Sequence, residues 1–447
     1  DGSVLHRLEG FLTTGLGKGV LYARDTPGFI GNRIGVFAIA TVMHHAARLG
    51  LPFDLVDRLT GVGVGRQKSA TFRTIDGYAC HAYSRDNGKS WQQDWMRYRP
   101  GDRAVKNSRA ANFAWRCSNG HYVYWLVNHG GEPLARFTRE NPALGYAHRN
   151  PAWMCGGVEK NGQIHWSEPE IILYHDDIGV RFSYPDFIEQ DGRFFVTETQ
   201  KSVARAHELD PSLLEAMWRQ GENGTVAEDA LVEHVGAGDV ALPELPTLHN
   251  REDGPLGMQI VDPAMGEAPT VAPRGGLTLE FWLRFQELTP WQMVFDSRDQ
   301  EGRGMTVMLT DRGTLRLNIC GRHYARPGGT WSAGLCETAW DTDPGLLEAG
   351  KLHHAVFIVD GGPKIITTVV DGQLCDGGDV RQYGWGRFHP ALKDANGAET
   401  ARLGPRMQGE VKRFRLYGRY LRTNDAVAHY LAGSDRDAIA SQSVGVK

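Results

Sequence analysis

Apolar positions recur with a helical period only in the first part of the chain. In residues 27–50, Ile30 and Ile34 begin an apolar face at helical spacing, and Gly50 follows as a stop signal. We predict a helix over this segment and a second, shorter helix that ends at Gly61.

From residue 75 onward the apolar positions fall in short runs separated by polar turns, which is typical of β-strands. Two hairpins are indicated in KNGQIHW and QDGRFF, where an Asx-Gly pair lies between apolar runs. One short helix is predicted to start at Asp210-Pro211, with Leu213, Leu214 and Trp218 on its apolar face. The region 75–240 is therefore β-rich.

The last part of the chain contains strand after strand. GLTLEFWLRF, MTVMLTDRGTLRLNI and GEVKRFRLYGRYL alternate in polarity and are separated by glycine-containing turns, so we predict a β-sandwich over residues 257–432. A proline-bearing polar stretch at 241–256 is predicted to be a linker, and the small polar residues 433–447 a frayed tail.

Composition narrows the function classes. With 41% hydrophobic and 23% charged residues and a net charge of −4, the 447-residue chain is typical of a globular protein and lacks the basic excess of nucleic-acid binders. No apolar run is long enough for a membrane span, and no signal-peptide pattern is present. The six cysteines form no C-x-x-C motif; Cys320 and Cys336 could pair in an exported protein, and buried free thiols are expected for the rest.

Residues 15–74 carry a family signature. GKGVLYARDTPGFIGNRIGVFAIATV, LVDRLTG and GRQKSATFRT resemble the 3-hydroxyacyl-CoA dehydrogenases, and Asn32 corresponds to the asparagine of that family's active site. No strand–G-x-G-x-x-G–helix unit for a dinucleotide precedes them, and the family's catalytic His–Glu pair would lie upstream. We therefore expect residues 1–74 to be a dehydrogenase-like helical segment without NAD-binding machinery, with Asn32 in a structural role.

The stretch SRDNGKSW resembles the Asp-box of sialidase-like β-propellers, through Ser84, Asp86, Gly88 and Trp91. In such a hairpin the aspartate bonds turn backbone, and we expect the tryptophan to anchor the next strand in the core. The region 75–240 has room for three blades, whereas propellers have about 4–8. An open sheet edge would result, which we expect the N-terminal helix or a second copy of the chain to cover.

The propeller resemblance directs attention to polar residues after and within the strands of this region. Glycoside cleavage uses two carboxylates, or a tyrosine with a carboxylate in sialidases, and arginines can clamp an anionic sugar. The candidate catalytic residues are Tyr184, Asp186 and Glu198. The candidate substrate-binding residues are His148, Arg149, His165 and Arg181. A His/Tyr pair would also suit a polysaccharide lyase. Each of these residues could instead have a purely structural role, in a turn, in a hydrogen bond of the core or on a solvated face of a strand.

The sandwich region resembles the laminin-G/concanavalin A-like superfamily in LTLEFWLRF, KLHHAVFIVDGG, VVDGQL and GEVKRFRLYGRYL. Such domains bind sugar or brace a catalytic domain. No cofactor is predicted, with calcium as the alternative in this domain. Its candidate ligands, which also suit turns, are Asp360, Asp371, Asp376 and Asp379. Trp331, Trp340 and Trp385 suit either sugar stacking or the core.

The predicted fold class is mainly β: a partial β-propeller and a concanavalin A-like sandwich after a short helical segment. The function hypothesis is a carbohydrate-active protein, namely a sialidase-like exo-glycosidase with an accessory lectin-like domain. A non-catalytic glycan-binding protein is the alternative, and a dehydrogenase relationship by N-terminal homology only is the second alternative. The expected partner is a glycan, with no nucleic acid and no membrane, and export is the expected location.

Overall fold

The structure is a computed structural model. It describes residues 2–10, 44, 48, 68–72, 74–86, 89–175, 178–200, 203–222, 224–248, 275–322 and 335–443. The chain divides into two compact units, of which the first holds residues 1–69 with 83–92 and the second holds residues 70–82 with 93–447.

The first unit contains helix α1 (Gly2–Gly10) and the loop after strand β2 (Cys80–Ser84). The helices predicted within residues 27–61, and Asn32 with them, lie outside the described residues apart from the two single positions 44 and 48. Their predicted structure therefore stays a prediction.

Asp86 organises the loop that resembles an Asp-box. Its Oδ1 accepts from Ser84 Oγ at 2.9 Å and from the Ser90 backbone nitrogen at 2.8 Å, as expected for a turn aspartate. The bonds from Ser90 lower the pKa of Asp86 to about 2. Trp91, however, is 47% exposed, so the prediction that it anchors the next strand in the core is wrong. It precedes strand β3 (Gln92–Trp95), whose first three residues are exposed as well.

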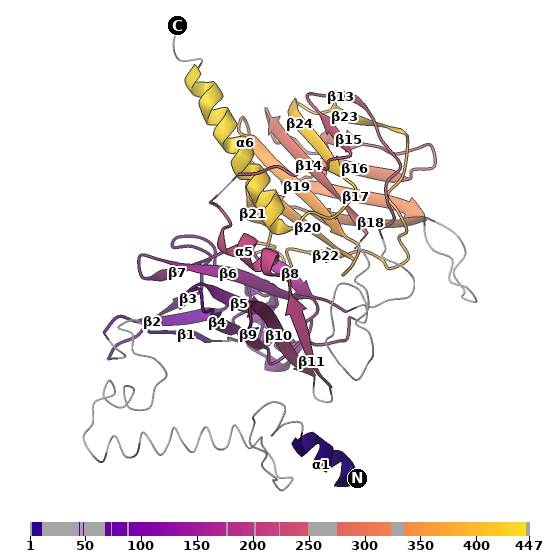
Figure 1. Cartoon of the computed structure of the whole chain (residues 1–447). Coiled ribbons are helices and arrows are strands. Elements are labelled where there is room, and N and C mark those ends of the chain that lie inside the picture. Colours follow the sequence, from indigo (N-terminus) through magenta and orange to yellow (C-terminus); the bar gives the residue numbers. More distant parts are fainter. Residues whose placement is uncertain are drawn as a thin grey trace. The chain divides into compact units, whose positions relative to one another are not determined.

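The second unit begins with what we call the blade region, residues 70–82 and 93–220. Its strands lie in three antiparallel sheets, with the orders β1-β2-β3, β4-β5-β6-β7 with β8 beside β6, and β11-β10-β9 (Figure 1). The strands not yet bounded are β1 (Lys68–Phe72), β4 (Phe113–Arg116), β5 (Tyr122–Leu126), β6 (Ala152–Lys160), β7 (Gln163–Trp166), β8 (Glu170–Leu173), β9 (Asp186–Gln190), β10 (Arg193–Gln200) and β11 (Val203–Leu209).

Three short helices accompany these sheets, two of them between β5 and β6 and one after β11. They are α4 (Glu132–Thr138), the 3₁₀ helix η2 (Pro142–Tyr146) and α5 (Pro211–Trp218). Asp210 caps α5 by accepting from the Ser212 backbone nitrogen at 2.9 Å, and Leu213, Leu214 and Trp218 are buried. The helix predicted from Asp210-Pro211 is therefore confirmed.

The sandwich, residues 231–427, consists of two sheets. One has the order β12-β24-β14-β19-β20-β21, with β22 beside β20, and the other has the order β13-β23-β15-β16-β17-β18. The first sheet's strands are β12 (Val232–His234), β24 (Gly409–Tyr417), β14 (Gly276–Phe285), β19 (Leu352–Asp360), β20 (Ile365–Val370), β21 (Gln373–Leu374) and β22 (Gly386–Arg387). The second sheet's strands are β13 (Gly238–Ala241), β23 (Thr400–Arg406), β15 (Met293–Asp296), β16 (Gly304–Leu309), β17 (Leu315–Arg322) and β18 (Leu335–Asp341).

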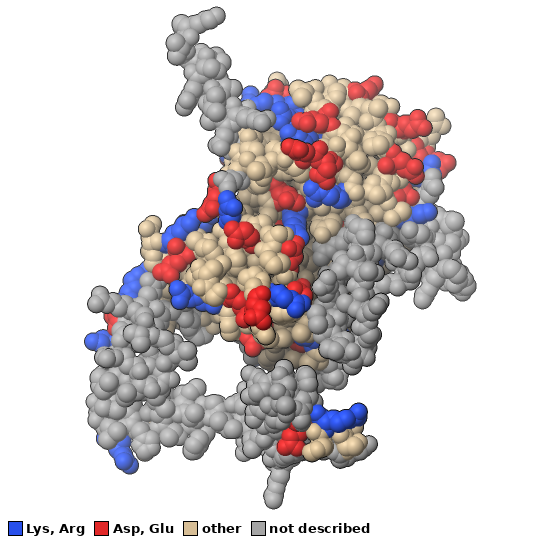
Figure 2. All heavy atoms as spheres, viewed as in Figure 1, with Lys and Arg blue, Asp and Glu red and all other residues tan. Residues whose placement is uncertain are grey.

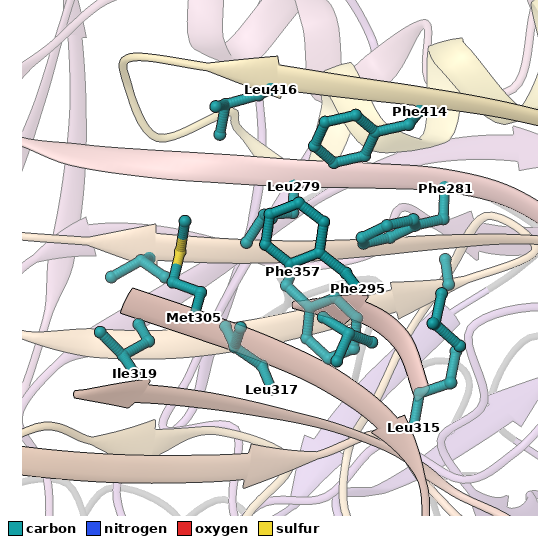
Figure 3. Packing of buried hydrophobic residues seen from close by; sticks show 14 of the residues in the cluster. Leu279, Phe281, Phe295, Met305, Leu315, Leu317, Ile319, Phe357, Phe414 and Leu416 are labelled. Atoms are coloured by element: carbon teal, nitrogen blue, oxygen red, sulfur yellow. The ribbon is translucent and has the colours of Figure 1, made fainter. Parts of the chain in front are cut away.

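The two sheets enclose an apolar core. Phe281, Phe357 and Phe414 from the first sheet meet Phe295 and Leu317 from the second (Figure 3). Phe281 alone contacts three of these rings, with ring centroids 5.1–6.5 Å apart. Alternating large apolar side chains on both inner faces are what a sandwich requires.

The first sheet is buried on its outer face as well. Val356, Ile358 and Val369 point away from the core and pack in a second apolar cluster with Tyr124 and Trp153 of the blade region. Strands β19 and β20 are therefore almost continuously apolar rather than alternating, as expected for a sheet that is covered on both sides. Helix α6 (Thr423–Ser443) adds Ala426 to the same cluster.

The sandwich starts earlier in the chain than the pattern indicated. Strand β12 pairs with β24, and β13 pairs with β23. Leu245 and Leu248 belong to the sandwich core although they lie in the predicted linker. The mainly β fold class with a sandwich is confirmed, and three sheets precede the sandwich.

All six cysteines are free, and four of them are buried. The pairing considered for Cys320 and Cys336 is therefore wrong. In the register of β17 and β18, Cys320 faces Glu337 whereas Cys336 faces Gly321. Neighbouring residues along a strand point to opposite faces, so the two thiols lie on different sides of the sheet.

The three tryptophans considered for sugar stacking differ in their position. Trp385 is buried and Trp340 packs against the sandwich core, whereas Trp331 lies outside the described residues.

On the surface, Lys/Arg and Asp/Glu side chains are interspersed on the visible face (Figure 2). In the described part of the chain, no helix has both the length and the apolar character to cross a membrane.

Candidate functional site

The register of the hairpin formed by β9 and β10 determines which of the predicted catalytic residues lie on the same face of the sheet. Its turn is Asp191-Gly192, both at positive φ, and it sets Gln190 opposite Arg193. Counting back along the strands places Asp186 opposite Thr197, one position out of step with Glu198. Because paired residues share a face and neighbours alternate, Asp186 and Glu198 point to opposite faces of this sheet.

Glu198 lies on the buried face. On strand β11, Arg205 pairs with Glu198 and His207 pairs with Val196, so all three polar side chains share that face. Arg205 Nη1 donates to Glu198 Oε1 at 2.9 Å, and His207 Nε2 lies 3.6 Å from the same oxygen. Glu198 is 0% exposed and His207 is 1% exposed, whereas the Arg205 side chain reaches solvent.

The Glu198–His207 pair has unused hydrogen-bonding capacity. Among the described residues, Glu198 Oε2 and both ring nitrogens of His207 have no hydrogen-bond partner. Leaving one buried polar atom unsatisfied costs about 1–3 kcal/mol, so such atoms need an explanation beyond packing. A carboxylate oxygen, an imidazole and an anchored guanidinium at one place are able to bind a polar ligand and to move a proton.

The other two predicted catalytic residues lie elsewhere. Tyr184 is 65% exposed at a φ of 48°, and Asp186 is exposed at the start of β9, where its Oδ1 accepts from the Phe187 backbone nitrogen at 2.9 Å. The structure therefore does not bring Tyr184 and Asp186 onto the face that carries Glu198. Asp186 is instead the first residue of β9, and its side chain bonds the backbone of the next residue of that strand.

Arg149 connects the loop before β9 to the end of η2. Its Nη1 donates to Ser183 Oγ at 2.5 Å, and its guanidinium lies 5.5 Å from the centre of the Tyr146 ring. The Ser183 carbonyl in turn accepts from the Thr199 backbone nitrogen at 2.8 Å. Arg149 is thus held next to the segment that follows Glu198.

His148 sits beside Arg149 at a φ of 58° and contacts two rings that the sequence patterns did not indicate. Its ring lies 6.2 Å from His129 and 5.8 Å from Tyr383, both edge-on. Burial, followed by the charges of Arg387 and Arg181, lowers the pKa of His148. Arg181 itself is exposed.

His129 is neutral and its tautomer is fixed. Burial lowers its pKa to about 3. Its Nε2–H donates to the His148 carbonyl at 2.7 Å, and Nδ1 accepts from Gln382 Nε2 at 3.1 Å. Neither His129 nor Tyr383 falls in a motif, and only their pairing in space across 254 positions reveals them.

His165 stands apart from this group. It lies on β7 opposite Val158, and burial, followed by Lys160 and Arg99, lowers its pKa. Among the described residues, none of the contacts given for His165 is with His148 or Arg149.

The four candidate calcium ligands are engaged separately. Asp360 accepts from Gly362 N, Asp371 from His353 and His354, and Asp376 from Arg103, while Asp379 lies 3.5 Å from the Tyr78 hydroxyl. Among the described residues, no group of three or more His, Cys, Asp or Glu side chains is arranged to hold a metal ion. Calcium binding therefore stays an untested expectation for this chain.

The comparison with family models places a known domain on the sandwich. Residues 264–427 match the family model described as the concanavalin A-like lectin/glucanases superfamily. This confirms the resemblance predicted for the last part of the chain.

A separate short segment is similar to curated dehydrogenases. It is 49% identical over 76 residues to a probable 3-hydroxyacyl-CoA dehydrogenase of Deinococcus radiodurans, and 43% identical over 76 residues to one of Bacillus subtilis. The match covers 17% of this chain, and it spans only 22% and 10% of those two relatives. The resemblance is confirmed over that length, and the chain joins it to a domain of a different kind.

Solved structures with some likeness include sialidase proteins. A carbohydrate-binding module of the Ruminococcus gnavus IT-sialidase, bound to α2,3-sialyllactose, aligns over 44% of this chain and 97% of its own, with 12% identity and a TM-score of 0.27. Trypanosoma rangeli sialidase aligns over 83% of this chain and 61% of its own, with 14% identity and a TM-score of 0.26.

Proposed function

We propose that this protein acts on glycans as an exo-glycosidase, with Glu198 as its central catalytic group. The observation that carries the proposal is the fully buried Glu198 carboxylate: among the described residues its Oε2 has no hydrogen-bond partner, and neither has either ring nitrogen of the buried His207 beside it. Burying such groups is costly, and active sites are where this cost is commonly found.

The chemistry follows from the positions of the three side chains. Arg205 donates to Oε1 of Glu198, which leaves Oε2 to accept a proton from a water or a sugar hydroxyl. His207 Nε2 lies 3.6 Å from Oε1, so a small movement brings it close enough to exchange a proton with the carboxylate. A carboxylate in this setting also stabilises the positive charge that develops on a sugar ring during cleavage.

The test is a hydrolysis screen on chromogenic glycosides, including sialosides and uronides. Glu198→Gln keeps the size and removes the charge, so we expect it to lower turnover by about a hundredfold or more. Glu208→Gln is the matched control, because Glu208 lies on the same strand pair, on the opposite face, and binds Arg193 at the surface. Full activity in Glu198→Gln would overturn the assigned role, and a wild-type chain that cleaves none of the substrates would overturn the hydrolase proposal.

A non-catalytic glycan-binding protein is the second candidate. The observation that favours it is the separation of Asp186 from Glu198 onto opposite sheet faces, which leaves Glu198 without the predicted second carboxylate. This alternative predicts glycan binding without turnover. In both versions we propose that the protein is exported and meets its glycan outside the cytoplasm. We also propose that it forms a homo-oligomer in which a second copy covers an open sheet edge.

A further inference from the structure

We propose that the loop 376–381 of the sandwich is a cation-binding cage, and that the ammonium group of Lys106 from the blade region occupies it in place of a metal ion. The inference is independent of glycan chemistry. It gives a ligand class, a primary ammonium ion, to a loop that contains two of the candidate calcium ligands, Asp376 and Asp379.

Lys106 is 2% exposed, and its ammonium group is fully used by the loop. Its Nζ donates to the carbonyl oxygens of Asp376, Gly378 and Arg381 at 2.8, 2.5 and 2.9 Å. A lysine ammonium has three N–H donors and no acceptor, so these carbonyls take all of its donors. Asp376 Oδ1 lies 3.8 Å from Nζ and adds a negative charge. Three carbonyl oxygens and one carboxylate oxygen of a single loop therefore lie around one cationic nitrogen.

The loop is folded so that its carbonyl oxygens face Lys106. Gly377 and Gly378 have φ angles of 92° and 51°, in the left-handed region that favours glycine. A Cβ atom at Gly377 would lie 2.5 Å from the Arg381 carbonyl oxygen, which leaves no room for a side chain. The Arg381 backbone nitrogen closes the turn by donating to the Gly377 carbonyl at 3.0 Å. These turns bring the carbonyls of three non-adjacent residues to one point.

A buried carboxylate holds the N–H side of the same loop. Asp343 accepts from the backbone nitrogens of Asp376 and Gly377 at 2.8 and 3.0 Å, and from Arg381 Nη2 at 2.7 Å. The peptide group between Asp376 and Gly377 thus has its N–H bonded to Asp343 and its C=O bonded to Lys106. Its dipole lies between an anion and a cation, so the loop is oriented to receive positive charge on its carbonyl side.

The blade region makes room for the lysine. A Cβ atom at Gly131 would lie 2.8 Å from Lys106 Cε, so a larger residue there would displace the side chain. A β-bridge with Tyr78 fixes the backbone of Lys106. Burial lowers the pKa of Lys106, whereas the charges of Asp376 and Asp343 act in the opposite direction. The two carboxylates therefore favour the charged form of the lysine at this buried position.

The distances in the cage fit an ammonium group better than a calcium ion. Charge-assisted N–H···O bonds are about 2.7–2.9 Å long, whereas calcium takes about six to eight oxygen ligands at about 2.3–2.6 Å. Asp376 is also engaged elsewhere, because its Oδ2 accepts from Arg103 Nε at 3.1 Å and its Oδ1 from Gly378 N at 2.9 Å. Calcium would need these oxygens and the space of Nζ, so we expect none in the loop while Lys106 is in place.

The experiment is chemical rescue of Lys106→Ala in the full chain. Methylammonium reproduces the Cε and Nζ groups that the substitution removes. Denaturant melts in methylammonium chloride should have a higher midpoint than melts in sodium chloride at the same concentration. At ten times its dissociation constant, a ligand that binds only the folded chain raises the folding equilibrium constant about tenfold.

Lys106→Met is the matched control. Its methyl group takes the position of Lys106 Cε and leaves no room for the methyl group of methylammonium, so we expect no rescue. Lys351→Ala, which removes an exposed lysine paired with Glu348, reports the general effect of the salt on stability. If Lys106→Ala does not fold, calcium titration of the wild type is the second test, and its denaturation midpoint should not change.

Each outcome decides for or against the cage. Rescue by methylammonium of Lys106→Ala alone supports it, and so does a wild-type midpoint that is insensitive to calcium. Equal midpoints of folded Lys106→Ala in the two salts count against it. Stronger rescue by calcium chloride than by methylammonium chloride would make the loop a metal site. Calcium that stabilises the wild type but not Asp376→Asn would overturn the assignment in the same way.

Discussion

Glu170 on strand β8 accepts a hydrogen bond of 2.7 Å from the backbone nitrogen of Asn424, the second residue of helix α6. A carboxylate at a helix N-terminus is favourable because it meets unpaired N–H groups there. Burial acts in the other direction and dominates, since it raises the pKa of Glu170 to about 7 against the bond from Asn424. The carboxyl that joins the blade region to α6 is thus set to titrate near neutral pH.

The first prediction follows from that raised pKa. Between pH 4.5 and about 7 the folded chain keeps a proton on Glu170 that the unfolded chain has lost, so the free energy of unfolding should fall as pH rises through this window. The contribution is about 3 kcal/mol at most. Glu170→Gln should remove it, which denaturant melts at pH 5, 6 and 7 will measure. A Glu170→Gln variant with the same pH slope as the wild type would contradict the prediction.

The second prediction concerns Glu280 in the outer layer of the sandwich. Burial alone would raise its pKa, but hydrogen bonds from His354 and His429 outweigh this and hold the pKa far below its usual range. Arg415 Nη1 also donates to it, at 2.8 Å. The Ala227 backbone nitrogen donates to His429 Nε2, so the His429 proton lies on Nδ1 and points at Glu280, 2.9 Å away.

Because the pKa of Glu280 is lower in the folded chain than in the unfolded chain, its ionised carboxylate stabilises the fold at pH values above the unfolded pKa near 4.5. This stabilisation is lost as the pH falls below 4.5 toward the pKa of the folded chain. Glu280→Gln takes the buried carboxylate away from Arg415, which then keeps only the exposed carboxylate of Glu233, so we expect a loss of about 3 kcal/mol in unfolding free energy at pH 7. Glu410→Gln, whose carboxylate pairs with Arg284 at the surface, is the control and should cost less than about 1 kcal/mol. Equal effects of the two substitutions would refute the importance of the buried network.

The third prediction tests the contact of Lys106 with the sandwich. Lys106→Met keeps the aliphatic stem but leaves three carbonyls of the loop 376–381 without their donor, so we expect a loss of about 3 kcal/mol. Lys351→Met removes an exposed lysine paired with Glu348 and should change stability by less than about 0.5 kcal/mol. Amide exchange of the loop 376–381 should accelerate in Lys106→Met alone. Protection equal to that of the wild type would show that the loop does not depend on Lys106.

The fourth prediction concerns the cysteines. Because Cys320 and Cys336 lie on opposite faces of their sheet, thiol titration of the unreduced, unfolded chain should find six free thiols. Mild oxidation of the folded chain should not join these two residues. A peptide containing a Cys320–Cys336 bridge, detected by mass spectrometry, would contradict the strand register.

Local patterns predicted the elements well and the contacts between them less well. The alternation in β14 and β24, the turn residues of the hairpins and the Asp210-Pro211 helix start each depend on a few neighbouring residues. The sequence also contained the information that Asp186 and Glu198 point to opposite faces. A two-residue Asp191-Gly192 turn determines which residues of the two strands pair, and from this register the face of each residue follows.

Other features depend on parts of the chain that are far apart in sequence. The bond from Arg387 to the Asn150 carbonyl joins residues 237 positions apart, and no local pattern marks either of them. Trp91 follows its motif, yet it is exposed, as are the first three residues of the strand β3 that it precedes. The sandwich boundary was placed too late because β12 and β13 are short and polar, and only their partners β24 and β23 identify them as strands.

Because β12 and β13 belong to its two sheets, the sandwich includes residues that precede the range 264–427 matched by the family model. A fragment that starts at residue 257 lacks β12 and β13, and it would expose the hydrogen-bonding edges of β24 and β23 together with the core pockets of Leu245 and Leu248. Such a fragment should aggregate on its own. Co-expression with residues 1–256 supplies the missing strands in trans, so the two pieces should reassemble as complementing halves of a split protein.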